Sequence, residues 1–124
     1  MEGIKLGEIE THFAEIVWNK EPLSTNQLVK LCAEELSWKR TTTYTVLKKL
    51  CEKGIFKVEK SLVTATISKQ EFDGIQSEQF IAQAFNGSLL AFLIAFTSRK
   101  TLDHTEIDAI QNLLSQIKND KEFL

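Results

Sequence analysis

The chain has 124 residues, of which 43% are hydrophobic and 26% are charged, with one Pro and five Gly. This composition is that of an ordinary globular protein and excludes disordered, collagen-like and repetitive chains. No apolar run reaches the roughly 18 residues that a membrane span needs, and residues 1–6 lack the basic and apolar stretches of a signal peptide. We therefore expect a cytoplasmic protein without direct membrane association.

The net charge of −2 conceals an uneven distribution. Residues 1–37 carry a net charge of −4 and residues 61–124 carry −3, whereas residues 38–60 hold seven basic and two acidic side chains, a net charge of +5. A concentrated positive field of this kind is the usual mark of a nucleic-acid surface. We expect any contact with nucleic acid to lie in residues 38–60 and not in the C-terminal half.

Residues 7–36 have the pattern of two amphipathic helices. In residues 7–19 apolar side chains recur at helical spacing, and we assign to the buried face Ile9, Phe13, Ile16 and Val17. Ser24, followed three positions later by Gln27, predicts a capping box that starts a second helix. The buried face of that helix comprises Leu28, Val29, Leu31, Cys32 and Leu36.

A third helix is predicted from Arg40 to Gly54, where glycine can take the left-handed conformation that ends a helix. Its core stripe is Thr43, Leu47 and Leu50, with Val46 and Cys51 as further candidates. Residues 55–60 and 62–68 then alternate or are rich in β-branched side chains, with a break at Lys60-Ser61. They predict a short β-hairpin. Both Trp18 and Trp38 are expected in the core.

Residues 69–124 predict three further helices, over 69–85, 87–97 and 103–119, with a break at Asn86-Gly87 and a cap at Thr101 or Asp103. Three short helices cannot bury so many apolar side chains alone, and an exposed patch of this size favours association. We assign to a dimer interface Phe80, Phe85, Leu89, Phe92, Leu93, Phe96, Ile110 and Leu114. The alternative, a monomeric core shared with the first half, stays open.

Enzyme chemistry has little support in the sequence. His12 and His104 lie in different halves, and the chain has no HExxH, no GxSxG and no glycine-rich phosphate loop. Cys32 and Cys51 are far apart and form no CxxC pair, so we expect two buried thiols instead of a disulfide framework or a cysteine metal site. We predict no enzymatic activity, no bound metal and no cofactor.

Three helices followed by a hairpin is the order of a winged helix-turn-helix, in which the third helix enters the major groove and the hairpin contacts the phosphate backbone. Arginine and small hydroxyl side chains are suited to base edges, and the third helix presents Arg40, Thr41, Thr42 and Thr45, with Lys49 one turn further on the same side. Side chains better suited to phosphate are Tyr44, Lys48, Lys53, Lys57 and Lys60.

Four stretches carry a resemblance to a known family: residues 14–18 (AEIVW), 24–29 (STNQLV), 38–54 (WKRTTTYTVLKKLCEKG) and 85–93 (FNGSLLAFL). They resemble the penicillinase-repressor family of the BlaI/MecI type, which also includes the copper-responsive CopY repressors. The resemblance implies a winged-helix DNA-binding domain with a two-stranded wing over residues 1–69, a three-helix dimerisation domain over residues 70–124, and repression by a homodimer at a palindromic operator in double-stranded DNA.

The chain also departs from the family pattern. Members commonly place a basic residue immediately before the first recognition threonine, whereas here that position is Thr41 and the charge falls on Arg40. The wing is shorter and lacks a glycine at its tip. The CxCxxxxCxC metal site of CopY repressors is absent, which excludes metal sensing by that route.

In the β-lactam branch of the family, a membrane sensor protease cuts the repressor at an Asn-Phe bond. The resemblance therefore implies such a protease as a partner, and the corresponding bond is Ala95-Phe96, of which only Phe96 matches. The plainer interpretation is that Phe96 is an aromatic residue of the dimer core.

Two alternative functions remain. A winged helix used for protein interaction should expose apolar side chains at positions 42, 45 and 49, which are Thr, Thr and Lys. A ligand-sensing repressor would need a pocket among Phe80, Phe85, Phe92 and Phe96, and the sequence does not distinguish a lined pocket from a filled core.

Overall fold

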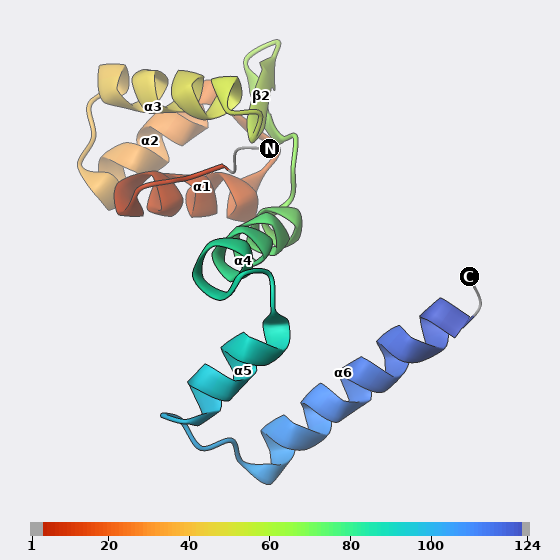
Figure 1. Ribbon diagram of the computed structural model, residues 1–124. Helices are drawn as coiled ribbons and strands as arrows, with labels where there is room; N and C mark the ends of the chain where they lie inside the picture. Colours follow the sequence, from red (N-terminus) through yellow and green to blue (C-terminus); the bar gives the residue numbers. More distant parts are fainter. Residues whose placement is uncertain (1–3, 123–124) are drawn as a thin grey trace. The chain divides into compact units, whose positions relative to one another are not determined.

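The structure is a computed structural model that describes residues 4–122 (Figure 1). Over these residues the order of elements is three helices, a β-hairpin and three further helices, with one short strand between the first two helices. The chain divides into two compact units between Phe80 and Ile81. The order of elements confirms the predicted mainly helical fold with a winged helix in its N-terminal part.

All six predicted helices are present in the described residues. The first unit contains α1 (Glu8–Lys20), β1 (Leu23–Ser24), α2 (Thr25–Leu36), α3 (Arg40–Glu52), β2 (Phe56–Glu59) and β3 (Leu62–Ala65). α4 (Lys69–Phe85) begins in the first unit and ends in the second, which also contains α5 (Leu89–Thr97) and α6 (His104–Glu122).

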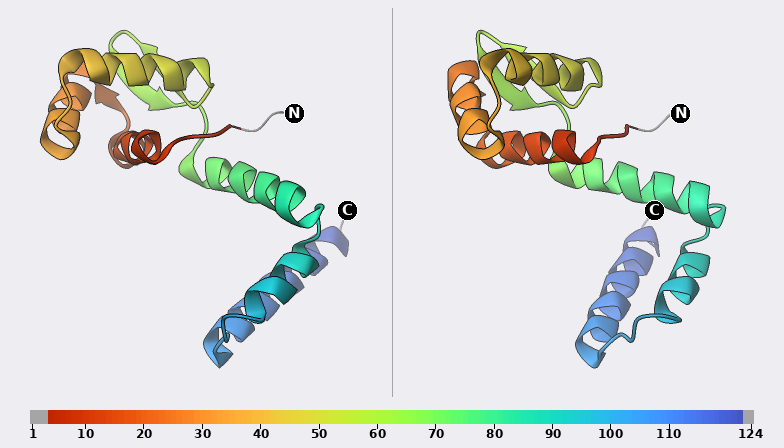
Figure 2. Two further views of the ribbon diagram at one scale, coloured as in Figure 1. Left: turned by 60° about the vertical axis from the view of Figure 1, so that its left-hand side comes forward. Right: turned by 90° about the vertical axis from the view of Figure 1, so that its left-hand side faces the viewer.

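The core of the first unit forms where α1, α2 and α3 pack together beside the sheet (Figures 1 and 2). Its largest fully buried side chains include Phe13, Leu28, Leu50 and Phe56. The predicted apolar face of α1 is correct at three of its four positions. Ile9, in the first turn of α1, is the exception and is 57% exposed.

Both tryptophans belong to this core, as predicted. The Trp38 ring stacks on Phe13 with ring centroids 5.7 Å apart, and Trp18 packs edge-on against Phe56 at 5.6 Å. The indole Nε1–H of Trp18 donates to the carbonyl oxygen of Ile67 at 3.0 Å, which satisfies the polar atom of a half-buried ring.

The sheet has three strands in the order β1-β3-β2, all antiparallel. The sequence predicted only the hairpin formed by β2 and β3. The missed strand, β1, has two residues, with Leu23 opposite Val63 and Ser24 opposite Leu62. A strand of this length leaves no alternating pattern to detect. It joins the hairpin to the helical part, because β3 is paired on both sides.

The turn of the hairpin is made by Lys60 and Ser61, which have φ angles of 52° and 61°. Two consecutive residues in the left-handed region are typical of a type I′ turn, for which glycine or asparagine is preferred. Side chains with a Cβ adopt this conformation at a steric cost. The carbonyl oxygen of Ser61 accepts from the backbone N–H of Thr25 at 3.0 Å, so the turn is also tied to the start of α2.

The first half of α4 packs with the winged helix. Phe72 is buried, and its ring lies 5.2 Å from that of Trp18. The compact units consequently divide within α4, between Phe80 and Ile81, whereas the domain boundary expected from the sequence lies at 69/70, where α4 begins.

The predicted break at Asn86-Gly87 is present, and α5 begins two residues later than predicted, at Leu89. Asn86 and Gly87 take positive φ angles of 51° and 81° at the break between α4 and α5. Ser88 caps α5, accepting from the backbone N–H of Ala91 at 3.0 Å. Of the two predicted caps for the last helix, Asp103 is the one used: its Oδ1 accepts from the N–H of Glu106 at 2.8 Å.

Within the described part of the chain, no single helix is long and apolar enough to cross a membrane. α4 and α5 reach that length and hydropathy only when they are taken together across the bend that separates them.

We expect Ser61→Gly to raise the free energy of unfolding by about 1 kcal/mol, because glycine removes the Cβ that disfavours the left-handed conformation. Urea unfolding followed by circular dichroism measures this change. Ser61→Ala is the matched control, since alanine keeps the Cβ and should give no gain. Equal stability of the glycine and alanine variants would contradict a strained turn.

Candidate nucleic-acid interface

The predicted recognition surface consists of the exposed side of α3 together with the β2–β3 hairpin, which lie side by side in both figures of the whole chain. The opposite side of α3 is held in the core by Thr43, Leu47 and Leu50. Thr43 is buried although it is polar, and its Oγ1–H donates to the carbonyl oxygen of Lys39 at 3.3 Å. Burial of this stripe fixes which side of α3 faces solvent.

The base-reading candidates of α3 lie on that solvent side, and so does Lys49 one turn beyond them. Thr41, Thr42, Thr45 and Lys49 are all exposed. The hydroxyl of Thr45 donates to the carbonyl oxygen of Thr41 at 2.8 Å. Because its proton is used within the helix, the Thr45 oxygen remains able to accept a hydrogen bond, and its methyl group is available for an apolar contact. Such a group is suited to a base amino group or to a thymine methyl.

Arg40 is held in place at the start of α3. Its Nη2–H donates to Oδ1 of Asn26 in α2 at 2.9 Å, and its guanidinium carbon lies 5.6 Å from the centre of the Tyr44 ring. A guanidinium group has five N–H donors, so this contact leaves others for a ligand. Sequence reasoning missed Asn26, because nothing in the pattern of α2 shows that its first turn faces α3.

The lysines at the other end of α3 have an intramolecular partner. Nζ of Lys49 lies 3.1 Å from Oε2 of Glu10 in α1, and Nζ of Lys53 lies 3.7 Å from Oε1 of the same carboxylate. Lys53 also donates to the carbonyl oxygen of Lys5 at 2.7 Å. Sequence reasoning did not single out Glu10, which lies roughly 40 residues earlier in the chain than Lys49.

Glu10 is favoured in its charged form by this environment. Its pKa is lowered, first by the backbone N–H of Gly7, which donates to Oε1 at 3.0 Å, and further by Lys49 and Lys53, against the opposing effect of partial burial. The carboxylate therefore stays ionised at neutral pH.

The remaining basic candidates lie on the wing, which is the β2–β3 hairpin, and on the neighbouring part of α3. Lys57 forms an exposed ion pair with Glu59 at 3.2 Å, and Lys60 is exposed at the turn. Lys48 lines a hollow of about 330 Å³ between α3 and β2, whose other lining residues are Thr25, Tyr44, Leu47, Cys51 and Val58. Cys51 faces this hollow and is therefore only half-buried, a correction to the expectation of two buried thiols.

Both thiols are kept protonated. Burial raises the pKa of Cys32 and also that of Cys51, for which nearby Glu52 adds to the effect. Neither thiolate is stabilised, as a cysteine nucleophile or metal ligand would require. Over the described residues no group of three or more His, Cys, Asp and Glu side chains is arranged to hold a metal ion.

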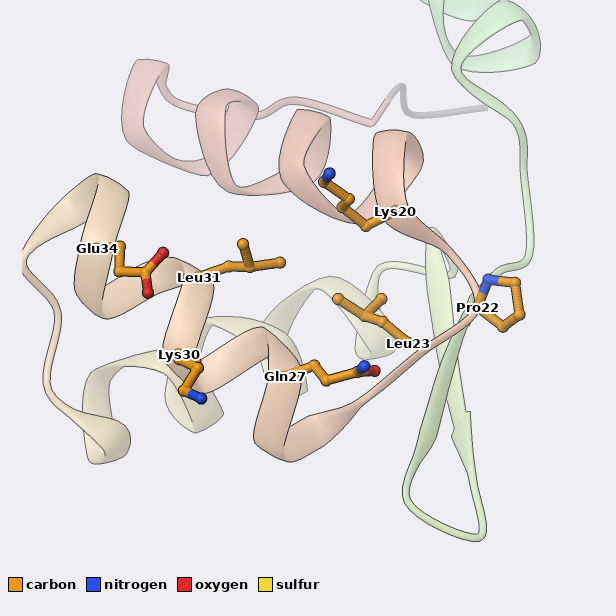
Figure 3. A pocket seen from close by; sticks show the side chains of 7 residues that line it. All are labelled: Lys20, Pro22, Leu23, Gln27, Lys30, Leu31 and Glu34. Atoms are coloured by element: carbon orange, nitrogen blue, oxygen red, sulfur yellow. The ribbon is translucent and has the colours of Figure 1, made fainter.

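A second hollow, of about 290 Å³, lies where the end of α1 meets β1 and α2 (Figure 3). Leu23 and Leu31 point into it, while Gln27 and the charged Lys20, Lys30 and Glu34 lie around its rim. The rim groups carry both signs of charge and are exposed. This arrangement does not select one class of ligand.

The comparisons with known proteins agree with the geometry. The model of the penicillinase repressor family matches residues 6–116 of the chain. Over 122 residues the chain is 23% identical to the penicillinase repressor of Bacillus licheniformis, with 95% of each protein covered. It is 21% identical over 116 residues to the methicillin resistance regulatory protein MecI of Staphylococcus aureus, covering 90% of this chain and 94% of that protein. The chain belongs to the penicillinase repressor family.

Members of the penicillinase repressor family are transcriptional regulators and not enzymes, which confirms the prediction that the chain is not an enzyme. The chain also has a likeness to the solved structure of Staphylococcus aureus MarR in complex with salicylate and kanamycin, over 91% of this chain and 71% of that chain, with 13% identity and a TM-score of 0.46. At this TM-score the likeness carries no conclusion about function.

The residues predicted to form a dimer interface lie on α4, α5 and α6 of this family member. Four of them are exposed, namely Phe80, Leu89, Phe96 and Leu114, and four are half-buried, namely Phe85, Phe92, Leu93 and Ile110. The ring of Phe92 lies 5.5 Å from that of Phe85 and 5.9 Å from that of Phe96. These three aromatics thus form a row along α5 and the end of α4.

The Ala95-Phe96 bond, which the family resemblance predicts as the cleavage site, lies inside α5. Both residues are exposed. A protease needs an extended substrate, so the last turns of α5 would have to unwind before this bond could be cut.

Proposed function

We propose that the chain is a homodimeric transcriptional repressor that binds a two-fold symmetric operator in double-stranded DNA through α3 and the wing. The observation that carries this proposal is the exposed side of α3 in a member of the penicillinase repressor family: small hydroxyl groups and Arg40 occupy it, within the one basic segment of the chain. Thr42 and Thr45 allow a close approach of the helix to base edges.

The positions of these residues support a division of roles. Arg40, Thr41, Thr42 and Thr45 lie at the N-terminal end of α3, which is the end that contacts base edges in helix-turn-helix proteins. Lys48 between α3 and the wing, together with Lys57 and Lys60 on the wing, is placed for phosphate, which positions the protein without reading sequence.

Dimerisation is supported by the apolar surface of the second unit. None of residues 81–120 is buried, although α5 consists almost entirely of apolar side chains. Large exposed side chains continue along α6 at Ile107, Leu113, Leu114 and Ile117. Leaving such a surface in water is unfavourable by about 25 cal/mol for each Å². We propose that a second copy of the chain covers this apolar surface. In this proposal residues 1–69 bind DNA and residues 70–124 form the dimer.

Under this proposal, regulation acts through the dimer. A single winged helix with few phosphate contacts binds weakly at physiological salt, and joining two of them raises affinity by making the second contact intramolecular. A signal that separates the two copies therefore releases the DNA. Cleavage by a membrane sensor protease at Ala95-Phe96 is one such signal, and it requires α5 to unwind first.

The test is selection of bound sequences from a pool of random duplexes by the purified chain, over several rounds and at two salt concentrations. We expect enrichment of a two-fold symmetric motif with half-sites about 10 bp apart or a multiple of it. A folded protein that enriches no motif would overturn the proposal and favour a protein-interaction module. Enrichment of an unsymmetric half-site would retain DNA binding but overturn the dimer.

Replacing Arg40 or Thr45 by Ala should relax base preference, with a loss of about 1–3 kcal/mol of discrimination for Arg40, whereas Lys57→Ala should weaken binding to every sequence alike and reduce the salt slope by about 1. Fluorescence anisotropy with the selected duplex and a scrambled duplex measures both effects. Equal losses on the two duplexes from both kinds of variant would contradict the division of roles.

Replacing Leu114 by Asp, an exposed position on the apolar side of α6, should convert the dimer to a monomer and weaken operator binding at least tenfold, because a charge is placed in an apolar contact. Analytical ultracentrifugation reads out the assembly state. Asn112→Asp is the matched control, since it adds the same charge on the opposite side of α6. A Leu114→Asp protein that remains a dimer would place the interface elsewhere.

A further inference from the structure

Glu10 of α1 forms ion pairs with two lysines at the C-terminal end of α3. Its two carboxylate oxygens lie 3.1 Å from Nζ of Lys49 and 3.7 Å from Nζ of Lys53. The carboxylate is also fixed from its own side, because Oε1 accepts from the backbone N–H of Gly7 at 3.0 Å. Its side chain is 18% exposed, compared with 59% for Lys49, so it is the more rigidly placed member of the pair.

A carboxylate in this position competes with DNA phosphate for the same ammonium groups. A lysine that is held by a fixed, partly buried acid releases fewer counterions when DNA binds, so it contributes less to sequence-independent affinity. The exposed Lys57–Glu59 pair differs, because an exposed ion pair opens at little cost. The opposite end of α3 has no such competitor in these contacts: Arg40 bonds to a neutral amide, and Thr45 bonds to a backbone carbonyl. Glu10 therefore acts on one end of the recognition helix only.

We propose that Glu10 is a specificity-determining residue: by holding Lys49 and Lys53, it lowers the affinity of the recognition helix for phosphate and makes binding depend on the base-reading end. The proposal rests on the DNA-binding function proposed above. It explains how a helix with several lysines can avoid strong binding to DNA of any sequence, which competes with the operator in large excess.

The informative variant is Glu10→Gln. Glutamine has nearly the same shape and keeps an oxygen that can accept from the Gly7 N–H, so the start of α1 is retained while the negative charge is lost. Glu8→Gln is the matched control, because Glu8 lies in the first turn of the same helix, is exposed, and changes the net charge by the same amount.

The measurement is fluorescence anisotropy with a labelled random-sequence duplex of about 30 bp, at three salt concentrations between about 50 and 200 mM. We expect Glu10→Gln to bind this duplex about three- to tenfold more tightly at the lowest salt, with a salt slope steeper by about 1 to 2, one for each released lysine. The ratio of affinities for the selected operator and the random duplex should fall. Glu8→Gln should leave the slope unchanged.

A second set of variants tests whether Glu10 acts through Lys49 and Lys53. Lys49→Gln in the wild-type background should change the slope little, whereas in the Glu10→Gln background it should reduce the slope by about 1. When both lysines are replaced by Gln, Glu10→Gln should have no effect. Thermal unfolding of each variant, recorded in the same buffers, verifies that folded protein is compared.

The outcomes separate this inference from the function on which it rests. If Glu10→Gln and Glu8→Gln have the same slope, or if the effect of Glu10→Gln persists without the two lysines, the role of Glu10 is wrong while DNA binding stands. If the wild-type chain binds neither duplex at any salt concentration, the proposed function itself fails.

Discussion

The position of the recognition helix depends on the aromatic packing around Phe13. This side chain of α1 is fully buried, with Trp38 stacked on it at 5.7 Å and Phe56 set edge-on at 6.5 Å. Trp38 immediately precedes α3, and Phe56 begins β2 just after it. Both ends of the recognition helix are therefore held against one residue of α1. Aromatic pairs of this kind add to the apolar area they bury, and they fix orientation as well.

The positive charge of the chain is concentrated on α3, which this packing holds, and on the hairpin. A net charge of −2 conceals a segment of +5, and the fold places this segment on α3 and the adjacent wing. The same fold brings Glu10 to the C-terminal end of α3, so that part of the positive field is neutralised before any ligand binds. The electrostatics of the interface are thus graded along the helix, from arginine and threonine at one end to paired lysines at the other.

The second unit differs from the first in the exposure of its apolar side chains. Its helices α5 and α6 have caps at Ser88 and Asp103, which define where they begin, but residues 81–120 form no buried core within the single chain. Their apolar side chains remain exposed along α5 and α6. In the proposed dimer the second copy supplies that core, and the stability of this half becomes inseparable from assembly. The proposed regulation would act on this assembly.

Sequence alone was sufficient for the six helices, the hairpin and the core stripe of α3, because helical periodicity, capping residues and turn residues are local signals. The family followed from the resemblance of four stretches, which the family model confirms. It also located the basic segment. The two-residue strand β1, the exposure of Ile9 and the half-burial of Cys51 depended on which elements pack against each other. So did Asn26 beside Arg40 and Glu10 beside Lys49, since residues far apart in the chain meet only when the core closes. The tertiary structure decided these contacts, because a local pattern specifies that a side chain is polar but not which partner it meets.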